Sequence, residues 1–436
     1  MSNLNSIKVN FEKTTGKIKP MNAVGQPPFI DIDFSMCDYL KDAHIPYSRL
    51  HDVGGAYGGG IFVDIPNLFR NFDADASNPD NYDFAFTDIL ISSLVERGIE
   101  PFFRLGVTIE NYIHIKAYRV YPPKDFQKWA EICEGVIKHY TQGWANGYNY
   151  NIEYWEIWNE PDNFDEIDKN QMWLGTAEEY YELYNVASKY LKNKFPNIKI
   201  GGYASCGFYA LTEADNQFAA CSPRFKYFID FFDGFLDYIK KNNCPFDFFS
   251  WHSYAAISDN ILWADYVRRR LDEAGYTNTE HTLNEWNCCP DLKGTARHAA
   301  LTCGMMLALQ NTSLNSAMFY DARCNRGMYS GMFNCYTFEP LPAYYSFVAF
   351  GELYCRKNQV EVGIDVPGVY ACAAKAEDGC LVIANTTSES IDIEIESLGA
   401  KDICECKIIA ENNIWNDFEF KNQLPSDSVI FVKYSL

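Results

Sequence analysis

Apolar and polar positions follow two alternating patterns along the first 355 residues. Short apolar runs, each expected to be a buried strand, are followed by longer stretches with the three-to-four-residue spacing of amphipathic helices. The expected strands are residues 21–25, 47–52, 101–106, 152–158, 199–203, 247–254, 281–286 and 315–321. The expected helices are residues 36–43, 83–97, 125–140, 177–195, 226–242, 265–274, 295–310 and 344–354.

Strands that alternate with helices are typical of an α/β protein with a parallel sheet. Eight such units over about 330 residues favour a closed (β/α)8 TIM barrel, which we expect to span residues 21–355. An open doubly wound sheet needs a glycine-rich phosphate turn that leads directly into a helix. The glycine-rich segment 54–60 does not, so we interpret it as a flexible active-site loop.

From residue 356 the pattern changes to short β-type runs at hairpin spacing. These runs are residues 360–362, 369–373, 381–385, 391–395, 404–409 and 429–432. They predict a C-terminal β-sandwich over residues 356–436. Residues 7–12 alternate in the same way, so we expect the N-terminal segment 1–20 to add a strand to that domain. No Gly/Ser linker separates the parts, which indicates rigid packing.

Charge and cysteine usage limit the partners and the compartment. The 436 residues carry 58 acidic and 37 basic side chains, a formal net charge of −21, which disfavours nucleic acid and anionic membrane surfaces. The chain contains no run of 18 apolar residues, so we expect no membrane span. The opening residues do not resemble a signal peptide. The 15 cysteines show no metal-ligand spacing, so we expect free thiols in the cytoplasm. Association into a homo-oligomer stays open.

Candidate chemistry lies at the ends of two expected strands. Glu160 follows the fourth strand and Glu285 ends the seventh, and a barrel places catalytic groups at the carboxyl ends of its strands. Two facing carboxyl groups, one protonated and one ionised, are what cleavage of a glycosidic bond requires. Asn159 is placed to bond the sugar's 2-hydroxyl. The alternative is that such glutamates only complement helix dipoles.

Other classes of enzyme have less support in the sequence. The chain has no His-Glu-x-x-His pattern, no metal-ligating cluster and no Gly-x-Ser-x-Gly elbow, so we expect neither a metal nor another cofactor. Aromatic residues make up 16% of the chain. That content is consistent with stacking against sugar rings and equally with a large aromatic core.

Several motifs together resemble the glycoside hydrolases of clan A, and in particular glycoside hydrolase family 39, which includes β-xylosidases and α-L-iduronidases. The motifs are the Trp-Asn-Glu-Pro of Trp158–Pro161 and the Asn-Glu-Trp-Asn of Asn284–Asn287. Arg49–His51, Tyr82–Gly106 and Ser250–Tyr254 resemble the second, third and sixth units of that family. The resemblance covers most of the chain, including the C-terminal β-domain.

The resemblance implies a retaining double displacement on a carbohydrate substrate. Glu160 would be the general acid/base and Glu285 the nucleophile, with Arg49 and Tyr254 orienting the nucleophile. The other residues expected to bind the substrate are His51, Asn159, His252, Trp286 and Tyr320.

Two stretches depart from the family pattern, so the resemblance does not determine which sugar the chain recognises. The family's β-xylosidases tend to carry His-Gly where this chain has His51-Asp52, and Phe-Ser-Asp where it has Phe319–Arg323. Asp52, Asp321 and Arg323 are therefore expected either to contact a different sugar or to pair with one another.

The sequence is compatible with three functions. The first is an exo-acting glycosidase on a β-xyloside or related glycoside. The second is an endo-acting exopolysaccharide hydrolase of the same family. The third is a catalytically inactive carbohydrate-binding protein.

Overall fold

The computed structural model describes residues 5–30, 35–53, 63–108, 120–212 and 223–436. The glycine-rich segment 54–60, predicted as an active-site loop, lies outside the described residues. Among the described helices, none is long and apolar enough to cross a membrane.

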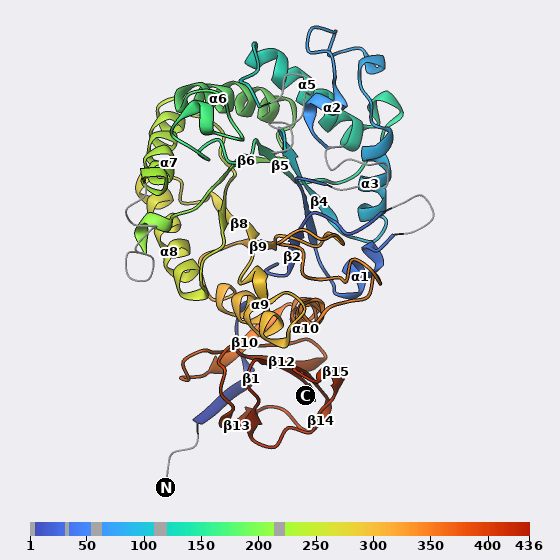
Figure 1. Ribbon diagram of the computed structural model, residues 1–436, viewed down its shortest axis with the longest axis vertical. Helices are drawn as coiled ribbons and strands as arrows, with labels where there is room; N and C mark the ends of the chain where they lie inside the picture. The colour runs from blue at the N-terminus through green and yellow to red at the C-terminus, as the bar shows by residue number, and fades with distance from the viewer. Residues whose placement is uncertain (1–4, 31–34, 54–62, 109–119, 213–222) are drawn as a thin grey trace.

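Eight parallel strands close into a barrel in the order in which they occur along the chain (Figure 1). This arrangement confirms the predicted (β/α)8 fold. The strands are β2 (Ala23–Gly25), β3 (Tyr47–Leu50), β4 (Glu100–Leu105), β5 (Tyr154–Ile157), β6 (Lys199–Ser205), β7 (Phe248–Ser253), β8 (Glu280–Trp286) and β9 (Ser316–Phe319).

Helices surround the barrel on its outside (Figure 1). They are α1 (Cys37–Asp42), α2 (Ile65–Leu68), α3 (Ala85–Val95), α5 (Phe126–Gln142), α6 (Ala177–Lys194), α7 (Pro223–Lys241), α8 (Ile257–Ala274), α9 (Ala296–Leu309) and α10 (Pro342–Arg356). Local signals explain several of their ends. Thr176 accepts a hydrogen bond from the backbone of Glu179, whose side chain accepts one from the backbone of Thr176, so a capping box begins α6. Gly275, at φ 93°, ends α8 in the left-handed conformation.

Helix α8 begins eight residues before the predicted start at residue 265. Its N-cap residue, Ala256, has no side chain that can accept a hydrogen bond from the first turn. The sequence therefore carries no start signal at this position, and the apolar contacts of Ile257 and Trp263 with the core fix the first turns instead.

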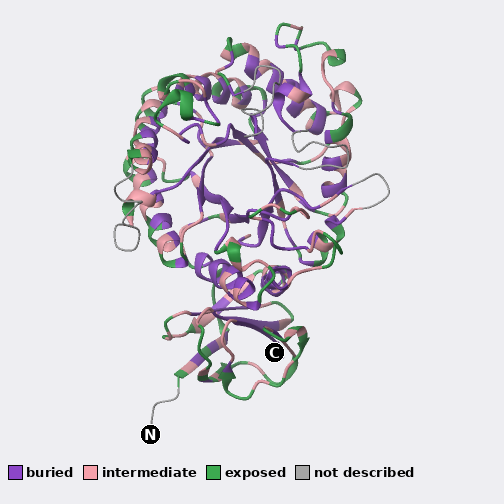
Figure 2. Cartoon of the chain, in the orientation of Figure 1, coloured by how far each residue is buried: buried purple, intermediate pink, exposed green. Residues whose placement is uncertain are grey.

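Side chains alternate between the inside of the barrel and the helix layer. Ala23, Phe102, Phe248 and Met318 form a small apolar cluster between the strands, on the inside of the barrel. The next inward positions along the strands are polar and buried, and include Arg49, Glu156 and Asn284. The inside of the barrel is therefore apolar towards the amino ends of the strands and polar towards their carboxyl ends. Figure 2 shows the strands as a ring of buried residues.

The C-terminal domain predicted as a β-sandwich is one curled, mostly antiparallel sheet of nine strands. Its spatial order is β15-β14-β17-β12-β11-β10-β1-β13-β16. The strands are β1 (Asn5–Lys17), β10 (Asn358–Gly363), β11 (Val369–Lys375), β12 (Asp378–Asn385), β13 (Ile391–Leu398), β14 (Ile403–Ala410), β15 (Asn413–Asp417), β16 (Gln423–Leu424) and β17 (Ser428–Ser435).

The N-terminal strand β1 lies inside this sheet. It pairs antiparallel with β10 on one side and parallel with β13 on the other. Residues from the two ends of the chain thus share one hydrophobic core, in which Ile7, Val9 and Phe11 are buried against strands of the C-terminal domain.

Helices α9 and α10 join the barrel to the sheet, with β11 and β12 packed against both (Figure 1). Gly304 of α9 lies close to the side chains of Thr386 and Tyr370, where a larger residue would collide with them. Arg356 at the end of α10 donates hydrogen bonds of 2.7 and 2.9 Å to the carboxylate of Asp378. These contacts pack the two parts against each other.

Candidate active site

Glu160 and Glu285, 125 positions apart in the sequence, meet at the carboxyl ends of the barrel strands. One carboxylate oxygen of each and one ring nitrogen of His252 all lie within 4.8 Å of one another. The predicted pair of carboxyl groups therefore exists as a pair in space.

The backbone after β5 turns sharply to present Glu160. Trp158 and Glu160 have φ values of 74° and 48°, in a region that costs a non-glycine residue roughly 1 kcal/mol or more. Hydrogen bonds hold this turn in place. The Trp158 amide donates to the Leu105 carbonyl at 2.8 Å, and the Glu160 amide donates to the Ala204 carbonyl at 3.1 Å.

A β-bulge in β8 presents Glu285. Trp251 of β7 lies opposite Leu283, but the next residue, His252, lies opposite Glu285. Asn284 is thus the extra residue, and its side chain donates a 2.5 Å hydrogen bond to Glu156 inside the barrel. A bulge of this kind re-aims the residues that follow it.

Glu285 is held from two directions. The Tyr254 hydroxyl donates to its Oε1 at 2.5 Å, and Arg49 Nη1 donates to its Oε2 at 3.2 Å. The carboxylate is 6% exposed. Both predicted orienting residues therefore contact the predicted nucleophile.

Arg49 also links Glu285 to two further groups. Its Nε donates to Glu156 at 2.8 Å, and its Nη2 donates to Asn159 Oδ1 at 2.5 Å. Arg49 and Glu156 are 1% and 0% exposed, so they form a fully buried ion pair. Asn159 is thereby fixed beside the reacting carboxylates.

Glu160 is held by two donors of its own. His252 Nδ1 lies 2.7 Å from Glu160 Oε1, and Asn163 Nδ2 donates to Oε2 at 3.0 Å. The other ring nitrogen of His252 lies 3.6 Å from Glu285 Oε2. The imidazole thus stands between the two carboxylates.

These contacts set where the protons lie. Burial favours neutral forms, but the two glutamates outweigh it at His252 and raise the pKa of that imidazole above 6.5. At Glu160, burial is outweighed by the hydrogen bond and charge of His252, and the pKa of the carboxyl falls below 4.5. Burial raises the pKa of Glu285 above 4.5, although His252 and Arg49 pull it down. One proton is therefore held within the 2.7 Å bond between His252 and Glu160.

His51 is held in a single tautomer. Burial, followed by the charge of Arg104, lowers the pKa of His51 well below its usual range, so the ring is neutral. Arg104 Nε donates to His51 Nδ1 at 3.2 Å, which places the ring proton on Nε2. Arg104 is itself paired with Asp64 at 2.6 Å.

The residues that depart from the family pattern form one cluster beside His51. The Tyr320 hydroxyl donates to Asp52 Oδ2 at 2.7 Å. Arg323 donates to Asp321 at 2.7 and 3.0 Å and contacts the Asp52 carbonyl at 3.3 Å. Asp321 and Arg323 therefore pair with each other, one of the two expectations for them, while Asp52 bonds to Tyr320.

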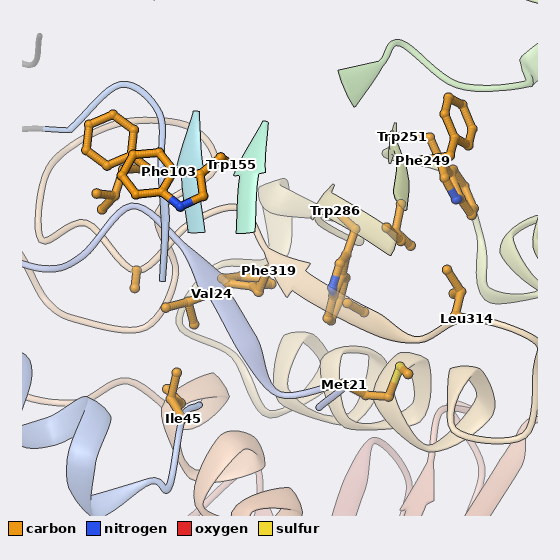
Figure 3. Close-up of a cluster of buried hydrophobic side chains, with 14 of the residues drawn as sticks. Met21, Val24, Ile45, Phe103, Trp155, Phe249, Trp251, Trp286, Leu314 and Phe319 are labelled. Atoms are coloured by element: carbon orange, nitrogen blue, oxygen red, sulfur yellow. The ribbon is translucent and has the colours of Figure 1, made fainter. Parts of the chain in front are cut away.

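Trp286 lies outside this group of side chains. Its indole is fully buried among core residues and packs edge-on against Phe319 at 5.3 Å (Figure 3). The bulge at Asn284 explains this position, because the residue that follows an inward-facing Glu285 points to the helix layer. The structure thus brings every other predicted site residue to the site and places Trp286 in the core.

Three residues at the site, Glu156, Asn163 and Tyr329, were not predicted from the sequence. Glu156 lies within β5, four residues before Glu160, and therefore before the loop in which the catalytic carboxylate was expected. Tyr329 belongs to the loop after β9, and its ring packs on that of Tyr254 at 4.6 Å. Burial, with Glu285 and then Glu160, raises the pKa of Tyr329. A loop residue of this kind has no signal in the periodicity.

Glu160, His252 and Glu285 are the one group of described residues whose ligand atoms are close enough to surround a metal ion. Their atoms already bond to each other, to Tyr254 and to Arg49. The guanidinium beside Glu285 would repel a cation, so these residues suit acid–base and nucleophilic chemistry better than metal binding.

The fold and this carboxylate pair define a barrel enzyme of the glycoside-hydrolase kind. The profile of the family described as Glycosyl hydrolases family 39 matches residues 6–267, which is more than half of the chain. The chain therefore belongs to glycoside hydrolase family 39.

Two curated relatives are β-xylosidases. The one from Geobacillus stearothermophilus is 24% identical over 322 residues, covering 69% of this chain and 58% of its own length. The one from Caldicellulosiruptor saccharolyticus is 28% identical over 268 residues, covering 56% and 46%. The chain thus spans about half the length of the curated relatives it matches.

Solved structures share the fold over the whole chain. A glucosidase from Croceicoccus marinus superposes with a TM-score of 0.80 at 19% identity, with 99% of both chains covered. A monomeric β-xylosidase from Caulobacter crescentus CB15 superposes with a TM-score of 0.69 at 14% identity and the same coverage. At these identities the likeness concerns the fold.

Proposed function

We propose that this chain is a retaining, exo-acting glycosidase that cleaves a β-xyloside or a related glycoside. The observation that carries the proposal is the spacing of the reacting carboxylates, which approach within 4.8 Å through one oxygen of each. Retaining enzymes hold their carboxyl groups about 5–5.5 Å apart, whereas inverting enzymes leave about 6.5–9.5 Å for a water molecule.

In the first step, Glu285 attacks the anomeric carbon and forms a covalent glycosyl ester. Tyr254 and Arg49 fix the attacking carboxylate from two sides, so its orientation is set before the substrate binds. Glu160 gives a proton to the departing oxygen in the same step. In the second step, Glu160 takes a proton from water, which attacks the ester and frees Glu285.

The proton for the leaving group comes from the Glu160–His252 pair. The raised pKa of His252 and the lowered pKa of Glu160 favour the imidazole side of their 2.7 Å hydrogen bond for this proton in the free protein. The charge of Glu285, 3.6 Å from the other ring nitrogen, helps to keep it there. As Glu285 loses its charge to the sugar, that attraction fades and the proton moves to Glu160, which delivers it.

The sugar is proposed from the relatives. The two curated relatives described above are β-xylosidases, and a glucosidase shares the fold. Asn159, fixed by Arg49, supplies the amide expected to bond the 2-hydroxyl, a contact that strengthens in the transition state of both xylosides and glucosides.

Hydrolysis of 4-nitrophenyl glycosides tests the proposal. The panel contains the β-D-xyloside, β-D-glucoside, β-D-galactoside, both α-L-arabinosides and the α-L-iduronide. We expect turnover of the β-xyloside or β-glucoside, lost in Glu285→Gln and retained in Glu394→Gln, an exposed glutamate of β13. Proton NMR of the first product should show the anomer of the substrate. The opposite anomer, or full activity of Glu285→Gln, would overturn the mechanism. No turnover of any panel member would overturn the exo-acting assignment.

A further inference from the structure

Most of the charged side chains buried around the active site form ion pairs. Among the described residues, Arg49 is paired with Glu156 at 2.8 Å, Arg104 with Asp64 at 2.6 Å, and Arg323 with Asp321 at 2.7 Å. Each of these carboxylates is fully buried. Apart from the catalytic glutamates, two buried carboxylates near the site have no such cation among the described residues: Asp162, which accepts from the Ser205 hydroxyl and the Cys206 amide, and Asp52.

Asp52 has hydrogen-bond donors near it but no cation of its own. Its Oδ2 accepts from the Tyr320 hydroxyl. Its Oδ1 is buried, lies 3.3 Å from Nε2 of the neutral His51, and has no hydrogen-bond partner among the described residues. Arg323 Nε and Nη2 both donate to Asp321 Oδ2, and the guanidinium contacts Asp52 only at its backbone carbonyl, through Nη1, while Nη2 also contacts the Tyr320 hydroxyl.

Asp52 lies on the glycone side of the site. It follows β3 and is bonded to a residue that follows β9, while Glu160 follows β5, four strands from β9 in the closed barrel of eight. The leaving group must lie against Glu160, so the rest of the sugar ring extends towards the opposite wall. Tyr320 connects that wall to the nucleophile, since its ring lies 6.4 Å from that of Tyr254.

We propose that Asp52 makes this glycone subsite selective for uncharged sugar rings and against uronates. The inference rests on the proposed function, because it concerns the sugar held at the same carboxylate pair. A buried carboxylate without a cation repels a second carboxylate at C5 of the sugar. His51 Nε2 can donate to a sugar hydroxyl, and Asp52 Oδ1 can accept from one.

Binding of two imino sugars that differ only at C5 tests this inference without requiring turnover. The probes are 1-deoxynojirimycin and its analogue with a carboxylate in place of the CH2OH group, measured by calorimetry. We expect the wild type to bind the neutral probe at least about tenfold more tightly. Asp52→Asn should reduce the ratio of the two affinities, neutral probe to carboxylate probe, by about tenfold, because it strengthens binding of the carboxylate probe.

Two further variants separate charge from shape. Asp321→Asn frees the Arg323 guanidinium to neutralise Asp52, so it should narrow the ratio as well. Asp237→Asn removes an exposed carboxylate on α7 and should leave the ratio unchanged. An unchanged ratio in Asp52→Asn, or no preference between the probes in the wild type, overturns the inference.

Hydrolysis of the neutral panel by the same preparations distinguishes the two proposals. Selective binding that narrows in Asp52→Asn without any hydrolysis would overturn the proposed function and leave this inference standing. Hydrolysis with a ratio that Asp52→Asn does not alter would do the reverse.

Discussion

Replacing Arg49 with methionine should separate a structural role from a catalytic one. Met fills a similar volume without charge, so Glu156 would stay buried with only the Asn284 amide as a partner. Removing one member of a buried ion pair costs about 3–5 kcal/mol. The lost hydrogen bond to the charged Glu285 costs a further 1.5–3 kcal/mol or so in transition-state stabilisation, roughly a 10- to 150-fold fall in kcat/KM.

The assay compares urea denaturation midpoints and kcat/KM in three variants. Arg49→Met should be destabilised strongly. Arg70→Met removes the cation of the exposed Arg70–Asp83 pair, 2.6 Å apart, and should cost no more than about 1 kcal/mol. The double change Arg49→Met with Glu156→Gln removes the uncompensated charge, so it should regain at least half of the lost stability and none of the activity.

Two results would refute this reasoning. If Arg49→Met costs no more than Arg70→Met, the buried pair does not carry the charge balance described above. If the double variant regains activity, then Arg49 does not orient Glu285, and its effect is exerted through the fold alone.

Three other predictions follow from the site and the sheet. The pH profile of kcat/KM should be bell-shaped. On the acid side, activity should fall at a pH above 4.5, because Glu285 has a raised pKa and gains a proton there. On the alkaline side, activity should fall at a pH above 6.5, because the His252–Glu160 pair loses a proton there. An acid-side midpoint at or below pH 4.5 would contradict this prediction. Trp286→Ala should lower the free energy of unfolding by about 3–5 kcal/mol and leave KM unchanged, whereas a large rise in KM would indicate a sugar contact. Deleting residues 1–17 should lower the thermal midpoint and cause aggregation, measured by circular dichroism and light scattering, because β10 and β13 lose the strand between them; an unchanged midpoint would show that the sheet closes without β1.

The sequence was sufficient to locate the catalytic pair because the fold places strand ends together. Glu160 and Glu285 each stand where an apolar run gives way to polar residues, and a closed barrel brings all such ends to one face. Arg49 and Tyr254 were found by resemblance, and the structure gives each a hydrogen bond to Glu285.

What the sequence could not predict depends on local irregularity. Simple alternation along β8 places Asn284 and Trp286 on the same face, and only the bulge sends Trp286 into the helix layer. The left-handed φ values at Trp158 and Glu160 likewise interrupt the alternation after β5. Which of Asp52, Asp321 and Arg323 form contacts with one another depends on distances between strand ends, and a one-dimensional pattern does not contain these distances.

The position of β1 between β10 and β13 has a consequence for the order of events during synthesis. Residues 5–17 leave the ribosome before the barrel strands, and their partners, residues 358–363 and 391–398, leave after them. The barrel strands lie between β1 and its partner strands in the sequence, so the barrel can form while β1 is still unpaired. The pairing of β1 with both neighbours can form only after residue 398 has been made, and contacts this distant in sequence form slowly. Until then the exposed edges and apolar face of β1 are available to chaperones or to other nascent chains.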